Sequence, residues 1–120
     1  MKKFLFIPLI FTFLPSPKPA LAEKESDCDL MYRAFIEAML DKMGNAVVKH
    51  GTNRLWNRGT EEILEVKRLN PRDLTRFTVT IRVKTFEGAH NPPYAFETMT
   101  IKLPEGDVIH YNIKWLEPKK

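Results

Sequence analysis

Residues 74–85 constrain the fold of this chain most, because apolar and polar side chains alternate along them from position 76 onward. The apolar positions are Phe77, Val79, Ile81 and Val83. A period of two residues is that of a β-strand, and one apolar face opposite one polar face is typical of an antiparallel sheet. The apolar face of such a sheet has to be covered by another layer of the domain.

Three further segments predict strands of the same sheet. They are residues 61–69, 94–103 and 108–116, with turn sequences at 70–73 and 104–107. In the second segment, the residues that share the apolar face are Ala95, Glu97, Met99, Ile101 and Leu103. In the last segment they are Ile109, Tyr111, Ile113 and Trp115. The four strands predict an antiparallel meander, in which only the facing of the first strand is ambiguous.

Residues 28–50 predict one amphipathic helix. Its apolar stripe is formed by Tyr32, Phe35, Ile36, Met39, Leu40, Met43, Ala46 and Val47. Ser26, Asp27 and Asp29 suit the helix start, Gly51 suits its end, and Gly44 is a place where the helix could bend. We expect a domain of class α+β, with this helix packed on the four-stranded meander in a two-layer, cystatin-like arrangement.

Residues 1–22 predict a secretory signal peptide that is cleaved after Ala22. They combine a basic start, an apolar core and small residues before the cleavage point. The apolar core is too short to span a bilayer, and the prolines behind it would break a helix. An uncleaved N-terminal anchor is the alternative. The single domain is then residues 23–120, and loss of the three lysines of the signal lowers the net charge from +4 to +1. We expect an extracellular protein with no transmembrane segment after cleavage and no nucleic-acid partner.

Cys28 is the chain's only cysteine, which excludes an internal disulfide. In an oxidising compartment, a lone thiol is either buried in the domain or available for an intermolecular bond. We expect a partly buried, inert thiol. A dimer through Cys28 is the less favoured alternative.

The most distinctive candidate site is the polar, proline-containing connection at 86–94. Alternation places Glu97 nearby on the apolar face, where a carboxylate needs hydrogen-bond donors. One interpretation is a pocket in which His90, Asn91, Tyr94 and Glu97 bind a ligand or serve acid/base chemistry. The alternative is structural, with Glu97 satisfied by an arginine or by loop amide groups.

The polar face of the sheet carries a second group of candidate residues. They are Arg76, Arg82, Lys84, Lys102 and Lys114. Several cations on one face attract an anionic polymer together at low salt. The alternative is an ordinary solvated face, whose lysines discourage pairing between sheet edges.

The three histidines do not predict a metal site, and no cofactor is expected. A hairpin register places His110 opposite about position 101, which is roughly 30 Å along the strand from His90 at ~3.3 Å per residue. The sequence contains no cysteine pair and no glycine-rich phosphate loop or Gly-x-Ser-x-Gly turn.

The segment Thr-Phe-Glu-Gly-Ala-His-Asn-Pro-Pro-Tyr at 85–94 resembles a family of short secreted proteins from Gram-positive, spore-forming bacteria. The family is known only as a domain of unknown function. The likeness includes Glu-Ile-Leu-Glu-Val-Lys-Arg-Leu at 62–69 and covers most of the mature chain. It implies compartment and fold and transfers no catalytic residue. The cystatin likeness does not extend to function, because the turn at 70–73 is Asn-Pro-Arg-Asp where inhibitory cystatins have Gln-x-Val-x-Gly.

These observations favour a secreted, non-enzymatic binding or envelope-associated module. It would present the 86–94 loop to an unknown protein or cell-envelope ligand, because consecutive prolines reduce the cost of ordering a contact surface. One alternative is a small pocket enzyme that uses Glu97 and His90. The other is a binder of anionic cell-wall polymer through the basic sheet face.

Overall fold

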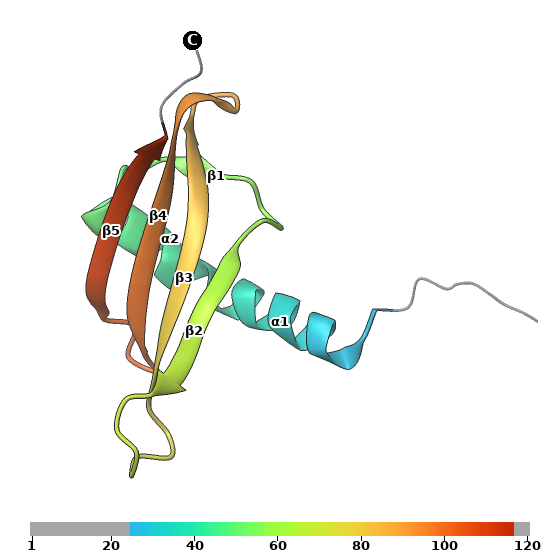
Figure 1. Cartoon of the computed structure of the whole chain (residues 1–120), viewed down its shortest axis with the longest axis vertical. Coiled ribbons are helices and arrows are strands. Elements are labelled where there is room, and N and C mark those ends of the chain that lie inside the picture. The colour runs from blue at the N-terminus through green and yellow to red at the C-terminus, as the bar shows by residue number, and fades with distance from the viewer. Residues whose placement is uncertain (1–24, 117–120) are drawn as a thin grey trace, which may run out of the picture. The chain divides into compact units, whose positions relative to one another are not determined.

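The structure, a computed structural model, describes residues 25–116, which form two helices and one antiparallel sheet of five strands (Figure 1). The helices are α1 (Asp27–Ala38) and α2 (Leu40–His50). The strands are β1 (Leu55–Trp56), β2 (Glu62–Arg68), β3 (Phe77–Glu87), β4 (Asn91–Leu103) and β5 (Val108–Leu116). The predicted class, α+β, is confirmed. The signal peptide predicted at 1–22 lies outside the described residues.

The chain divides into two units between Tyr32 and Arg33. In the first unit, α1 begins as predicted, because the Asp29 amide donates to Ser26 Oγ at 3.1 Å and Asp27 and Asp29 lie in the first turn. Cys28 is exposed, so the expectation of a partly buried thiol was wrong. The first turn of α1 leaves that side chain in solvent.

The predicted single helix at 28–50 is interrupted at Met39. The Met39 amide is shared between the carbonyl oxygens of Phe35, at 3.0 Å, and Ile36, at 3.1 Å. Gly44, where the sequence allowed a bend, lies inside α2. Met39 is buried in the core, and neither glycine nor proline marks the interruption in the sequence. Only the packed structure therefore reveals where the helix divides.

The central strand of the sheet is β3, which pairs with β4 on one side and with both β2 and β1 on the other. The strand β1 corrects the prediction of four strands. It pairs Leu55 with Phe86 and Trp56 with Thr85, within the segment at 52–60 that we expected to be a loop. Two residues are too few to show a period, so the sequence gives no signal for this strand.

A bulge between β4 and β5 changes which residues of β5 face the core. Thr100 pairs with His110 and Ile101 pairs with Val108, which leaves Ile109 as an extra residue. Ile109 is exposed, contrary to the predicted alternation, and Val108 packs against the core. One inserted residue shifts the alternation of every residue beyond it.

The buried apolar residues form one cluster that α1, α2, β3 and β4 share. Its members are Ile36, Met39, Met43, Ala46, Val47, Val79, Ile81, Val83, Met99 and Ile101. The alternation predicted for β3 and β4 is confirmed by their buried positions.

The two ends of the sheet carry different connections, as the meander predicted (Figure 1). At one end, Arg76 in the β2–β3 connection pairs with Glu105 in the β4–β5 turn. At the other end lie β1, the β3–β4 hairpin and the end of β5, where Tyr94 pairs with Leu116. Among residues 25–116, neither helix has the length and apolarity that a bilayer span requires.

Candidate functional site

The β3–β4 hairpin turns over residues 88–90 and is shorter than the loop predicted at 86–94. Asn91 already belongs to β4 and pairs with Glu87, and both prolines lie within that strand. Gly88 and His90 adopt the left-handed backbone region, with φ of 47° and 62°. This region is uncommon for a residue with a side chain, so the tip geometry fixes where His90 projects.

The tip is held by contacts between side chains that the sequence had singled out. The His90 ring lies edge-on to the Phe86 ring, with centroids 4.4 Å apart. The Tyr94 hydroxyl donates to the His90 carbonyl oxygen at 2.8 Å. Asn91 is exposed beside them. The structure therefore brings His90, Asn91 and Tyr94 together.

A groove of about 480 Å³ lies beside the hairpin. Its lining is Asn57, Thr60, Glu62, Arg82, Lys84, Phe86, His90, Tyr94 and Phe96. Two cations in it lie over aromatic rings: the Arg82 guanidinium is 4.5 Å from the Phe96 ring centre, and Lys84 Nζ is 4.9 Å from that of Tyr94. We call this the basic groove. It joins the hairpin residues to part of the basic sheet face, which the sequence had left as separate candidates.

The charge in the basic groove is unevenly paired. Arg82 forms an ion pair with Glu62, with Nη2 and Oε1 2.6 Å apart. In the described part of the chain, no carboxylate forms an ion pair with Lys84, which is exposed. Lys114 on β5 pairs in register with Phe96. The groove therefore carries a net positive charge, with Lys84 as its accessible cation.

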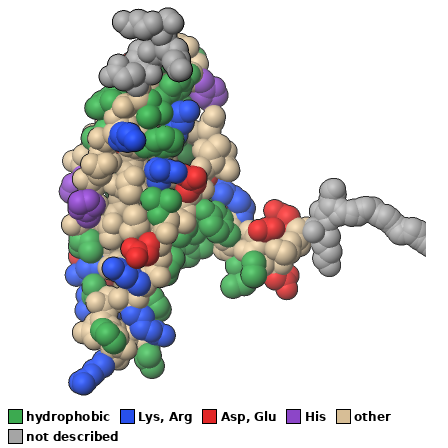
Figure 2. All heavy atoms as spheres, viewed as in Figure 1, with side chains coloured by type: hydrophobic (Ala, Val, Ile, Leu, Met, Phe, Trp, Pro, Cys, Tyr) green, Lys and Arg blue, Asp and Glu red, His purple; other side chains and the backbone are tan. Residues whose placement is uncertain are grey.

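The five predicted cations do not form one patch. Arg82, Lys84 and Lys114 lie toward the hairpin, whereas Arg76 is paired with Glu105 at the opposite end and Lys102 faces Thr78 there. Figure 2 shows lysine and arginine side chains scattered among apolar and uncharged ones over the visible face. The positive charge near the hairpin is thus local.

Glu97 lies apart from the basic groove, fully buried on the core face of β4. Its Oε1 accepts from the Thr52 amide at 3.1 Å and from the Tyr111 hydroxyl at 2.5 Å. Its Oε2 accepts from the Thr85 hydroxyl at 2.7 Å and from the Thr52 hydroxyl. Every donor is a hydroxyl or a loop amide, and alternation puts Tyr94 on the other face of the strand. We call these residues the Glu97 cluster.

Gly51 completes the Glu97 cluster by leaving room for it. A methyl group at this position would overlap Glu97 Oε1 and the Tyr111 hydroxyl. The sequence predicted Gly51 as a helix end, and α2 does end at His50. The close approach of the Glu97 carboxylate to the backbone is a second reason why position 51 is glycine. Burial raises the pKa of Tyr111 well above its usual value, and the hydrogen bond to Glu97 raises it further.

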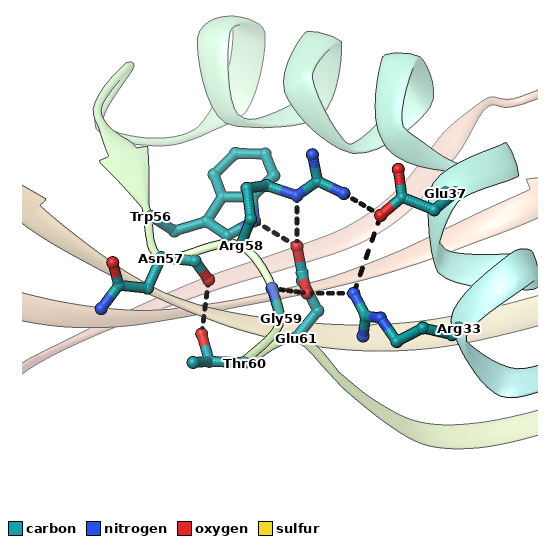
Figure 3. Close-up of polar contacts among 8 residues, drawn as sticks. All are labelled: Arg33, Glu37, Trp56, Asn57, Arg58, Gly59, Thr60 and Glu61. Carbon is teal, nitrogen blue, oxygen red and sulfur yellow. Dashed lines mark hydrogen bonds and ion pairs between the residues drawn. The ribbon is translucent and has the colours of Figure 1, made fainter. Parts of the chain in front are cut away.

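A second buried carboxylate, Glu61, precedes β2 and was not among the candidate residues predicted from the sequence (Figure 3). Its Oε1 accepts from Arg33 Nη2 at 2.9 Å and from the Gly59 amide at 2.8 Å. Its Oε2 accepts from Trp56 Nε1 and Arg58 Nε, each at 2.9 Å. We call these residues, with Glu37, the Glu61 cluster. A glutamate before a strand resembles a surface residue, and only the nearby Arg58 and Trp56 could have hinted at its burial.

The Glu61 cluster ties α1 to the segment between β1 and β2. Glu37 pairs with Arg58 and lies 3.9 Å from Arg33 Nη2, so two glutamates and two arginines alternate. Burial alone would raise the pKa of Glu61, but the donors from Trp56, Arg58 and Gly59 outweigh it and lower that pKa below the usual value. Glu61 is held as a carboxylate by this arrangement.

Neither carboxylate cluster is arranged for metal binding. Among residues 25–116, no group of three or more His, Cys, Asp or Glu side chains could hold a metal ion. The donors around each buried carboxylate fill the positions that a ligand would need. The basic groove, in contrast, is open to solvent.

The fold and groove define a small α+β domain with an aromatic, positively charged surface at one sheet end. The chain belongs to the DUF3888 family of proteins of unknown function, whose model matches residues 32–114. Comparison with curated proteins and with solved structures returned no match. The matched range contains both carboxylate clusters and every residue that lines the basic groove.

Proposed function

We propose that this protein is an exported, non-enzymatic binding module that holds an anionic polymer of the cell envelope in the basic groove. The carrying observation is that Arg82 and Lys84 lie over Phe96 and Tyr94 beside the His90 hairpin. An aromatic ring next to a cation offers one ligand both apolar contact and positive charge. The repeating unit of an acidic polymer, which carries a negative charge on a carbon skeleton, can use both contacts. The accessible charge of Lys84 supplies the attraction.

Export rests on the signal peptide expected at 1–22, and an origin in spore-forming Gram-positive bacteria rests on the motif at 85–94. Both are part of the proposal. The two-layer, cystatin-like arrangement is also proposed, with support from the cluster that both helices share with β3 and β4. That likeness concerns the fold alone.

Two of the functions predicted from the sequence become one hypothesis: that the hairpin contacts a ligand, and that the basic sheet face binds an anionic polymer. They merge because His90 and Tyr94 line the same groove as Lys84. The pocket-enzyme alternative has less support. Glu97 is fully buried, and its four donors already satisfy both carboxylate oxygens. A general acid or base has to reach its substrate.

Titration with soluble polyglycerol phosphate at increasing salt tests the proposal. We expect binding that weakens steeply between low and high ionic strength, because exposed charges are screened. Lys84→Gln should weaken it about fivefold, which corresponds to ~1 kcal/mol. Lys49→Gln, which removes an exposed lysine of α2, is the matched control. The proposal would be overturned if the affinity did not change with salt concentration, or if Lys84→Gln and Lys49→Gln lowered the affinity equally.

A further inference from the structure

A second groove, of about 510 Å³, lies beside the basic groove. It is lined by Leu40, Leu55, Trp56 and Arg58, together with three residues that also line the basic groove: Asn57, Phe86 and His90. We call it the apolar groove. The two grooves therefore share a wall at the base of the hairpin.

The lining of the apolar groove is mostly hydrocarbon. Leu55 is 72% exposed although it lies in a strand, and Trp56 is half-buried beside it. Among residues 25–116, Arg58 is the one arginine, lysine or carboxylate of the lining, and it is engaged by Glu61 and Glu37. The described lining of this groove therefore offers apolar contact area, and its arginine is already paired.

Two rings in contact form the shared wall. Phe86 is 8% exposed and packs edge-on against His90, whose backbone φ of 62° lies in the left-handed region. Lys84 and Arg82 lie on one side of this wall, and Leu55 and Leu40 lie on the other. A ligand that crosses the wall meets cations at one end and aliphatic side chains at the other.

We infer that the two grooves form one site for an anionic amphiphile, with its phosphate or carboxylate head in the basic groove and an alkyl chain in the apolar groove. The head-group half rests on the proposed function, and the alkyl half is new. Charge complementarity selects this occupant, because a purely apolar partner would leave the Lys84 side of the wall unused and a hydrophilic polymer would leave Leu55 uncovered.

The test is a nuclear magnetic resonance titration of residues 23–120 with three probes, each kept monomeric. Dihexanoyl phosphatidylglycerol carries an anionic head and two short chains, glycerol 3-phosphate carries the head alone, and dihexanoyl phosphatidylcholine carries the same chains on a zwitterionic head. We expect phosphatidylglycerol to bind at least tenfold more tightly than either of the others. Amide shifts should appear at both Lys84 and Leu55.

Two exposed leucines provide matched variants. Leu55→Ser should weaken phosphatidylglycerol binding about tenfold and leave glycerol 3-phosphate binding unchanged. Leu74, in the β2–β3 connection at the opposite end of the sheet, is also 72% exposed, and Leu74→Ser should change neither. Thermal unfolding of both variants checks that each remains folded.

Equal binding of phosphatidylglycerol and glycerol 3-phosphate, with no effect of Leu55→Ser, would overturn the inference and leave the proposed function standing. Equal binding of phosphatidylglycerol and phosphatidylcholine would overturn the anionic preference. Failure of the proposed function is distinguished by the polyglycerol phosphate titration, which does not involve Leu55. Binding of none of the three probes would overturn the joint site.

Discussion

The Glu61 and Glu97 clusters bury the same type of side chain by different means. Glu61 is surrounded by two guanidinium groups, an indole N–H and a backbone amide, none of which can accept a hydrogen bond. Glu97 is surrounded by three hydroxyl groups and one amide, and hydroxyl groups can both donate and accept. The first cluster requires a charged carboxylate, whereas the second requires only shape and hydrogen bonds.

The clusters also differ in what they connect. The Glu61 cluster joins α1 to the segment that leads into β2. The Glu97 cluster joins the end of α2 to the middle of the sheet, through Thr52 on one side and Tyr111 on the other. The two clusters have no residue in common and adjoin at one backbone pair, Trp56 with Thr85. Substitutions of Glu61 and Glu97 themselves therefore allow the two clusters to be compared by their free energies of unfolding.

The largest expected effect is that of Gly51→Ala in the Glu97 cluster. The added methyl group overlaps the Glu97 carboxylate and the Tyr111 hydroxyl. The carboxylate is fully buried and the two groups are hydrogen-bonded to each other, so moving them disrupts the cluster. We expect a loss of about 3 kcal/mol or more in the free energy of unfolding, measured with denaturant.

Gly44→Ala is the control for that measurement. Nothing lies within 4 Å of a methyl group at this position inside α2. The substitution should stabilise the protein by about 0.5–1 kcal/mol, because alanine favours a helix. Similar losses at both glycines would show that crowding around Glu97 is not the cause.

The next effect separates the two carboxylates directly. Glu61→Gln should lower the free energy of unfolding by about 2 kcal/mol, because the new amide nitrogen would face only hydrogen-bond donors. The loss is not larger because solvent partly screens the two arginines. Glu97→Gln should cost about 1 kcal/mol, because the threonine hydroxyls can rotate to accept from the new amide. An equal cost in the two variants, measured by denaturant unfolding, would contradict the distinction.

Tyr111→Phe removes one of the four donors of Glu97 and should cost about 1 kcal/mol near neutral pH. The raised pKa of Tyr111 adds a pH dependence. Above the ordinary value of 10.0, the unfolded chain loses the phenol proton while the folded chain retains it, so the wild type loses stability. The difference between wild type and variant should therefore shrink as the pH rises above 10.0. A constant difference would argue against protection of the phenol by burial.

The smallest expected effect is the dependence of stability on acidic pH that Glu61 causes. Because folding lowers the pKa of Glu61 from 4.5, its stabilising contribution is present above pH 4.5 and is lost as the pH falls through the folded value. The gap between wild type and Glu61→Gln should narrow below pH 4.5 in a series of denaturant titrations. A gap that stays unchanged to the lowest pH at which the protein folds would contradict this assignment.

Much of the candidate surface could be predicted from sequence, because it follows from alternation along single strands. Tyr94 and Lys84 were assigned to the polar face and Glu97 to the apolar face on this basis alone. What could not be predicted is that His90 belongs with Lys84 and not with Glu97. That separation depends on a three-residue turn and a strand that starts at Asn91, and the prolines had indicated a longer loop.

The sequence by itself determined the class of the fold, because periods of two and of three to four residues are properties of single segments. The strong strand at Phe77–Glu87 and the start of α1 at Asp27 follow from such local patterns. Only the tertiary structure decided that Glu61 is buried, that Gly51 must be glycine and that two grooves meet at Phe86 and His90. Each depends on atoms far apart in the chain, and no local pattern encodes which distant donor a carboxylate will find.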